Sequence, residues 1–158
     1  MDHLRTAMAA VVVTSGLLTL ACSGIVAGTE IAGADVTPGT VTTVPFTPTG
    51  EEALWLDYDV GFSRPYGITG DIVVLESGAE VRRFPIILTA DDGPVVGETS
   101  RLQVNQRESS FNGAGSASAM VWCADLEGLT PGVAHEVHAT LGPTAGTTVN
   151  GLRVKVMR

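Results

Sequence analysis

The sequence predicts an all-β fold: an antiparallel β-sandwich of about seven strands, preceded by a signal peptide and a flexible tether. Three observations lead to this prediction. From Glu51 onward, apolar and polar residues alternate with period two, which is the pattern of half-buried strands. Clusters of Gly, Pro, Asp and Ser separate these runs. No stretch shows the pattern of an amphipathic helix of ordinary length, so two packed sheets are the expected architecture.

Residues 1–21 have the layout of a secretory signal peptide, with a short polar start that carries Arg5 and an uncharged run from Ala7 to Ala21. As a helix this run would span about 22 Å, which is shorter than a bilayer core of about 30 Å. We therefore expect a cleaved signal peptide and not a permanent transmembrane helix.

The residues Thr19-Leu20-Ala21-Cys22 resemble the lipobox of bacterial lipoproteins, although the usual leucine three places before the cysteine is replaced by Thr19. The resemblance implies that Cys22 carries acyl chains such as palmitate and holds the chain on a membrane of the bacterial cell envelope. Ser23 after the cysteine favours the outer membrane or cell surface over the inner membrane. The alternative is ordinary cleavage after Ala21, which would leave Cys22 able to form a disulfide with Cys123.

Composition limits the remaining choices. After a 21-residue leader, a chain of 158 residues leaves room for one domain. The formal net charge is −8, and Lys155 is the only lysine beside eight arginines scattered along the chain. No basic patch is available to neutralise phosphates, so nucleic acid is excluded as an expected partner.

Residues 22–50 are expected to form a lipid-anchored tether, because residues 23–50 hold five glycines, seven threonines and three prolines with only two charges, Glu30 and Asp35. An alternative stays open for 41–46, whose β-branched residues could form a first edge strand that tolerates Pro45. The sandwich domain is expected over residues 51–158.

Seven runs within the domain have the strand pattern. They are 53–60, 68–75, 81–88, 101–106, 117–124, 133–141 and 148–157. Residues 76–80 are a natural hairpin connection between the second and third runs, and residues 142–146 connect the last two. The glycine-rich stretch 113–116 lacks the lysine of a phosphate-binding loop and is expected to be a mobile loop.

The segment from Leu129 to Val137, LTPGVAHEV, resembles the corner before the penultimate strand of fibronectin type III and related immunoglobulin-like domains. In those domains a leucine, a Pro-Gly turn and a tyrosine six residues after the leucine recur. Here His135 stands where the tyrosine is expected. The resemblance implies an immunoglobulin-like sandwich in which an imidazole nitrogen takes over the bond from the tyrosine hydroxyl to the backbone.

The first strand places its side chains on two faces. Leu54, Leu56, Tyr58 and Val60 point to the core, and Trp55, Asp57 and Asp59 point the other way. An exposed tryptophan beside carboxylates could stack on a sugar or anchor a protein, unless a loop or the tether covers it. The turn that follows concentrates Arg64 and Tyr66 at one end of the sandwich, where binding loops cluster. Trp122 is expected in the core.

These residues favour a non-catalytic module for protein or glycan interaction, with Trp55, Asp57, Asp59, Arg64 and Tyr66 as candidate binding residues and no cofactor or metal. The alternative is a small hydrolase or calcium-dependent carbohydrate-active domain, since Asp57 and Asp59 lie about 7 Å apart on one face. A zinc site is excluded, because residues 135 and 138 would point to opposite faces of a strand.

Overall fold

The computed structural model of the chain describes residues 28–63, 66–89, 95–96, 99–100 and 103–158. The strands are β1 (Glu30–Asp35), β2 (Val41–Phe46), β3 (Ala53–Ser63), β4 (Gly67–Glu76), β5 (Ala79–Thr89), β6 (Val95–Val96), β7 (Thr99–Ser100), β8 (Gln103–Phe111), β9 (Ala114–Asp125), β10 (His135–Pro143) and β11 (Thr147–Met157). Within these ranges there is no helix, and hence none with the length and apolarity needed to cross a bilayer.

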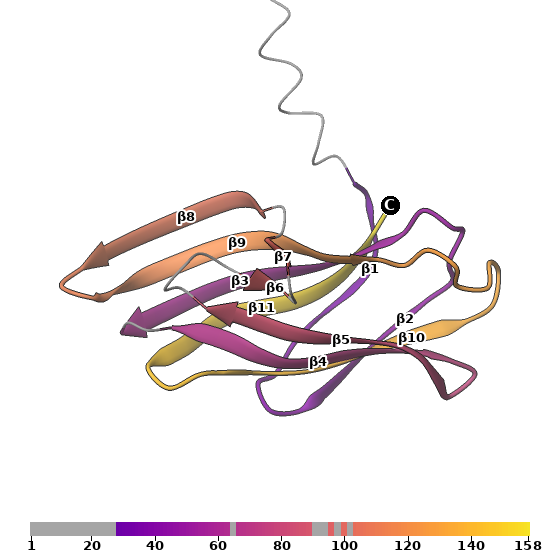
Figure 1. Cartoon of the computed structure of the whole chain (residues 1–158), viewed down its shortest axis with the longest axis horizontal. Coiled ribbons are helices and arrows are strands. Elements are labelled where there is room, and N and C mark those ends of the chain that lie inside the picture. The colour runs from indigo at the N-terminus through magenta and orange to yellow at the C-terminus, as the bar shows by residue number, and fades with distance from the viewer. Residues whose placement is uncertain (1–27, 64–65, 90–94, 97–98, 101–102) are drawn as a thin grey trace, which may run out of the picture.

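Two antiparallel sheets face each other and form a β-sandwich (Figure 1). The five-stranded sheet has the order β1-β11-β3-β9-β8, and the four-stranded sheet has the order β2-β10-β4-β5. The small β6-β7 ribbon lies beside β5. The prediction of an all-β antiparallel sandwich is confirmed.

The connections of this sandwich are those of a jelly roll. The strands pair as nested antiparallel couples: β1 with β11, β2 with β10, β3 with β9 and β4 with β5. Such nesting arises when one long hairpin of paired strands is rolled into two sheets. The last two strands therefore lie in opposite sheets, whereas an immunoglobulin domain keeps them together in one sheet.

The core lies between the sheets and consists of the alternate side chains that the sequence pattern assigns to it. The largest side chains that are less than 2% exposed include Leu54, Leu56, Ile68, Ile72, Ile86, Leu126 and Leu141. Three short side chains of β9, Ala117, Ala119 and Val121, complete the inner face of that strand. Burial of this apolar surface is the main stabilising contribution to the fold.

The tether predicted over residues 22–50 is wrong from Glu30 onward. β1 pairs with β11 and β2 pairs with β10, so both segments belong to the sandwich, and the alternative of an edge strand at Val41–Phe46 is confirmed. The segment was predicted to be a tether because its Gly/Thr-rich composition conceals an alternation of buried and exposed residues. Val44 and Phe46 are buried, while Pro45 is exposed. β2 is an edge strand, where proline is tolerated because no hydrogen bond of the sheet is lost.

Two further expectations need correction. The stretch 113–116 is not a mobile loop, because Asn112 and Gly113 form the two-residue turn of the β8–β9 hairpin and β9 begins at Ala114. Both turn residues have positive φ, 50° and 77°, as a type I′ turn requires. Trp122 is not in the core. It is the cross-strand partner of Trp55, and both side chains lie on the outer face of the sheet.

In the corner before β10, His135 occupies the position where a tyrosine is expected. The ring of His135 is buried, and its Nδ1 lies 2.8 Å from the carbonyl oxygen of Val133 two residues upstream. The imidazole thus makes the local bond to the backbone that a tyrosine hydroxyl makes in the corner it resembles. The corner precedes the penultimate strand of the sandwich, as the resemblance implies.

Residues 1–27 lie outside the described residues, and with them the signal peptide and Cys22. Arg64 also lies outside them. Cys123 is described: it is 2% exposed, and its thiol lies 3.7 Å from the carbonyl oxygen of Val121. The predicted lipid anchor and its disulfide alternative both remain predictions.

Candidate functional site

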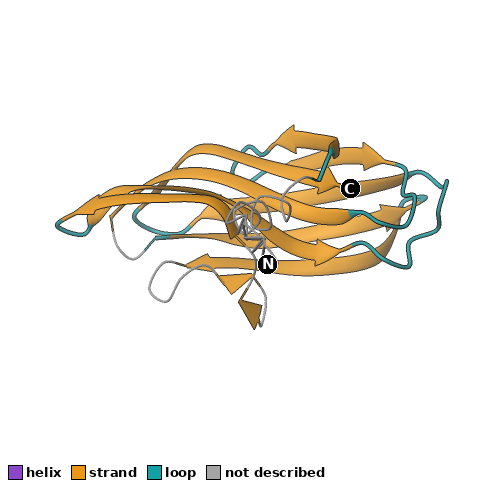
Figure 2. Ribbon diagram, turned by 90° about the horizontal axis from the view of Figure 1, so that it is seen from above, coloured by secondary structure: helices purple, strands orange, loops and turns teal. Residues whose placement is uncertain are grey.

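The outer face of the five-stranded sheet brings together three of the candidate residues. β3 lies at the centre of this sheet, and Trp55, Asp57 and Asp59 point away from the core on alternate positions. Figure 2 shows the strands running side by side along the molecule. Neighbouring strands therefore surround each of these side chains on both flanks.

Cross-strand contacts engage both carboxylates. The ammonium of Lys155 on β11 lies 2.6 Å from Asp57 Oδ2, and the amide of Asn150 donates to Asp59 Oδ1 at 3.2 Å. Lys155 is only 15% exposed, and it also lies 3.9 Å from Glu30 on β1. The paired charges are thus held in fixed positions by strands that come from both ends of the chain.

A second ion-pair group continues this row to the edge of the sheet. Arg153 on β11 donates to Glu30 at 2.6 Å and to Asp35 at 3.1 Å, so its guanidinium ties β1 to β11. These two hydrogen bonds raise the pKa of Arg153. From β1 through β11 to β3, the outer face therefore presents acidic, basic and again acidic side chains.

Three adjoining hollows lie along this face, with volumes of about 470, 190 and 210 Å³. They share lining residues: Asp57 and Asp59 each line two of them, as do Arg107 on β8 and Ser118 on β9. We call the continuous depression formed by Asp57, Asp59, Arg107, Ser118 and Lys155 the outer-face groove. It crosses the central strands of the sheet.

Glycine keeps part of this groove open. Gly151 lies opposite Asp59 on β11, and a Cβ placed there would be 3.8 Å from the Cβ of Asp59, which is ordinary contact. No glycine torsion constrains this position, since its φ lies outside the positive range. A larger side chain could therefore be accommodated by the backbone while it filled the groove.

Trp55 does not offer a free ring face. It is 9% exposed and lies in a cross-strand row between Lys155 on β11 and Trp122 on β9. The indole N–H of Trp122 donates to Asp125 at 3.1 Å. The structure therefore supports the interpretation that Trp55 is covered by its neighbours and is not exposed for stacking on a ligand. Trp55 and Trp122 lie side by side at one end of the outer face.

Tyr66 lies away from the groove. Its ring stacks on Phe62 with centroids 4.1 Å apart, and its hydroxyl is 3.5 Å from Glu108 Oε2. Burial, together with the charges of Tyr66 and Glu108, raises the pKa of the neighbouring Tyr58 to about 12. Tyr66 therefore belongs to a cluster at the edge of the core, and the structure does not bring it together with Asp57 and Asp59.

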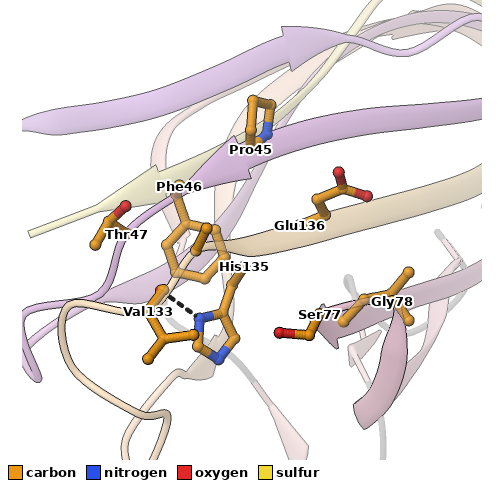
Figure 3. A pocket seen from close by; sticks show the side chains of 10 residues that line it. Pro45, Phe46, Thr47, Ser77, Gly78, Val133, His135 and Glu136 are labelled. Carbon is orange, nitrogen blue, oxygen red and sulfur yellow. Dashed lines mark hydrogen bonds between the residues drawn. The ribbon is translucent and has the colours of Figure 1, made fainter.

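A separate hollow of about 570 Å³ lies at one end of the four-stranded sheet (Figure 3). Its walls include Pro45, Phe46, Ser77, Val133 and His135. The buried Nε2 of His135 lies 2.9 Å from Glu76 Oε2 yet is not aligned for a hydrogen bond, so the contact is electrostatic without being directed. Nδ1 of the histidine thus supports the corner, whereas Nε2 is buried beside Glu76 without a hydrogen-bond partner.

Arg107, Ser118, Asn150 and Lys155 were not among the candidate residues. Part of this pattern was visible in the sequence, since Arg153 and Lys155 alternate with the buried Leu152, Val154 and Val156 on a run that was predicted to be a strand. The sequence does not show which strands are neighbours in the sheet. No local pattern indicates that β11 pairs with β3 on one side and with β1 on the other. The groove depends on that pairing.

Chemically, the outer-face groove places hydrogen-bond donors beside acceptors. Asp57 and Asp59 accept, Arg107 and Lys155 donate, and the hydroxyl of Ser118 can do both. Across the described residues, no group of three or more His, Cys, Asp or Glu side chains is positioned to hold a metal ion. The arrangement can bind a polar, uncharged or weakly charged ligand.

A scan of family models, a search of curated proteins and a search of solved structures found no match to this chain.

Proposed function

We propose that this chain is a bacterial envelope lipoprotein, anchored to the membrane through Cys22, that displays its sandwich as a non-catalytic module for protein or glycan interaction. The anchor and the location rest on the lipobox resemblance at residues 19–22. For the module we propose the outer-face groove as the binding surface and a glycan as the ligand.

The observation that carries this proposal is the alternation of donors and acceptors along one open groove. A sugar hydroxyl both donates and accepts, and vicinal hydroxyls are best recognised by a carboxylate beside a cation or an amide. Asp57 beside Lys155 and Asp59 beside Asn150 are two such pairs. Because the partners are already in contact, little side-chain entropy is lost when a ligand binds.

The hydrolase alternative has less support. A glycosidase needs one carboxyl group that carries a proton and another that is free to attack or to activate water. Asp57 forms an ion pair with Lys155, and Asp59 accepts a hydrogen bond from Asn150. Neither carboxylate lies in an enclosed pocket that would exclude water.

The test fills the groove without removing any polar group. Gly151→Tyr places a ring beside Asp59, and Gly142→Tyr is the matched control, because Gly142 lies on the outer face of the other sheet and a Cβ there is 3.9 Å from its nearest neighbour. Binding is measured by co-sedimentation with purified peptidoglycan sacculi and by affinity electrophoresis in gels that contain a neutral glucan.

We expect wild type and Gly142→Tyr to bind at least one of these glycans, and Gly151→Tyr to bind it at least about tenfold more weakly, a change of about 1.4 kcal/mol. Equal binding by all three proteins would place the ligand elsewhere. Failure of wild type to bind either glycan would refute a glycan ligand of these classes and favour a protein partner.

A further inference from the structure

The four edges of the two sheets differ in how they are protected. Exposed edges of β-sheets invite pairing with another chain, and short strands or prolines normally prevent it. β1 has only six residues, β2 contains Pro45 and β5 contains Pro85. β8 forms the remaining edge, is nine residues long and contains no proline. Among the strands that the structure describes, this edge alone has neither the short length nor the proline that protects the other three.

The end of β8 also carries the most exposed large apolar side chain of the described residues. Phe111 is 81% exposed and stands beside the Asn112-Gly113 turn. Figure 1 shows that the β8–β9 hairpin projects beyond the neighbouring strands at this end of the sandwich. Burying an exposed aromatic ring against a partner is favourable, because it removes apolar surface from water.

The ladder between β8 and β9 limits which part of the edge can pair regularly. The register shifts between Val104 and Arg107, so a bulge interrupts the strand there. From Arg107 to Phe111 the register is regular. Phe111 pairs with Ala114 across the two-residue turn, so its backbone N–H and C=O point to β9, and the backbone N–H and C=O groups of Glu108 and Ser110 point away from β9.

We propose that β8 pairs antiparallel with β8 of a second copy of this chain, about a twofold axis at Ser109. Full overlap of the regular segment 107–111 with itself requires this centre. Glu108 and Ser110 then exchange backbone hydrogen bonds across the axis, with Ser109 facing Ser109 of the second copy in a position without such bonds. This pairing concerns assembly and does not depend on the glycan proposal.

Side-chain chemistry favours the same centre. Centred on Ser109, the pairing places the guanidinium of Arg107 opposite the exposed ring of Phe111, a cation–π pair that forms twice. A centre at Arg107 would oppose two guanidinium groups, and a centre at Glu108 would oppose two carboxylates. The dimer would join the two five-stranded sheets into one, with both outer-face grooves on the same side.

Disulfide trapping tests the pairing and its register together. Single Ser109→Cys, Arg107→Cys and Glu108→Cys variants of the full chain are expressed, exported, extracted and oxidised with copper phenanthroline, and dimers are read on non-reducing gels beside wild type. Opposed residues at Ser109 would have Cα atoms about 4.5 Å apart, within the range of about 4.4–6.8 Å that a disulfide spans. Each of the other two variants reports a competing register.

We expect a rapid dimer with Ser109→Cys, and only the wild-type background with Arg107→Cys and Glu108→Cys. Adding Phe111→Ser to Ser109→Cys should lower the dimer yield at least fivefold, whereas adding Val41→Ser, which removes an exposed apolar side chain on β2, should not. Absence of the Ser109→Cys dimer, faster trapping at position 107 or 108, or equal effects of the two serine substitutions would overturn the proposal. Urea midpoints under reducing conditions establish that each variant is folded.

Discussion

Replacement of Tyr58 by phenylalanine should remove a specific loss of stability at high pH. Tyr58 is 6% exposed on β3, and burial, with the charges of Tyr66 and Glu108, raises its pKa to about 12. An unfolded tyrosine ionises near pH 10. A folded-state pKa above the unfolded value contributes stability that is complete below about pH 10 and is lost as the pH rises through about 12.

The size of the effect follows from the shift. Two pKa units at about 1.4 kcal/mol each correspond to roughly 2.7 kcal/mol of unfolding free energy. Urea unfolding at about pH 9 and about pH 12 should therefore show wild type losing about 2–3 kcal/mol more than Tyr58→Phe. Tyr66→Phe is the control and should retain most of the loss, because burial is the largest cause of the shift. Equal losses in wild type and Tyr58→Phe would refute the reasoning.

Three further substitutions probe different contributions to stability. Glu52 is 1% exposed, and although burial alone would raise its pKa, hydrogen bonds from Thr49 and Gly50 outweigh burial and lower it. Glu52→Gln should therefore cost about 1–3 kcal/mol at neutral pH, and urea titrations should show this gap closing as the pH falls below about 4.5 and wild type protonates. Ile72→Ala, at a fully buried position of β4, should cost about 2–5 kcal/mol in urea unfolding. Arg153→Ala should cost less than about 1 kcal/mol by the same assay, because its ion pairs are partly exposed; a larger loss would show that they hold β1 in place.

Strands β3, β4, β5, β9, β10 and β11 could be predicted because each has one face in the core. In the run from Leu54 to Val60, alternate residues are buried as the sequence pattern requires. The pairing of the strands could not be predicted in the same way. Whether the last strand lies beside β3 or beside β10 depends on contacts between residues about ninety positions apart, and local patterns carry no information about them.

The failure at Trp122 has a specific physical cause. Leu54 pairs with Ala124 but Trp55 pairs with Trp122, so Cys123 is an extra residue in β9 and forms a bulge. Before the bulge the odd-numbered residues of β9 face the core, and after it Ala124 and Leu126 do. Counting alternate residues across such a bulge assigns the tryptophan to the wrong face.

The β8–β9 turn has a local signal in the sequence, the pair Asn112-Gly113. Asn-Gly is the strongest short sequence for a two-residue hairpin turn, because both residues tolerate positive φ. The prediction of a mobile loop followed from the glycines at 113 and 115 together with the lack of the lysine that a phosphate-binding loop requires. Gly115 has another role: a Cβ there would lie 2.0 Å from the carbonyl oxygen of Ser109, so close approach of the two strands requires glycine.

Because β1 begins at Glu30, the segment between Cys22 and the sandwich is short, and this limits how far the sandwich can lie from a membrane. If Cys22 carries the lipid, Thr29 is only seven residue steps further along the chain, and the backbone carbonyl of Thr29 accepts a hydrogen bond from Arg158 at 2.9 Å. Seven residues reach at most about 25 Å even when fully extended. The net charge of −8 repels an anionic bilayer, so we expect the sandwich to stand away from the surface with its Arg158 end held close.

Energy transfer to a lipid-bound acceptor measures this arrangement. A donor on Arg158→Cys of the lipidated protein in vesicles should be strongly quenched. A donor on Asn112→Cys should be quenched less, because Asn112 lies in the turn of the β8–β9 hairpin, which points away from the C-terminus in Figure 1. Acylation would block Cys22, and burial protects Cys123 from the dye. Quenching at Asn112 equal to or above that at Arg158 would contradict the upright arrangement. Absence of quenching at both positions would contradict the anchor itself, because no tether of this length could hold Arg158 beyond the reach of the acceptor.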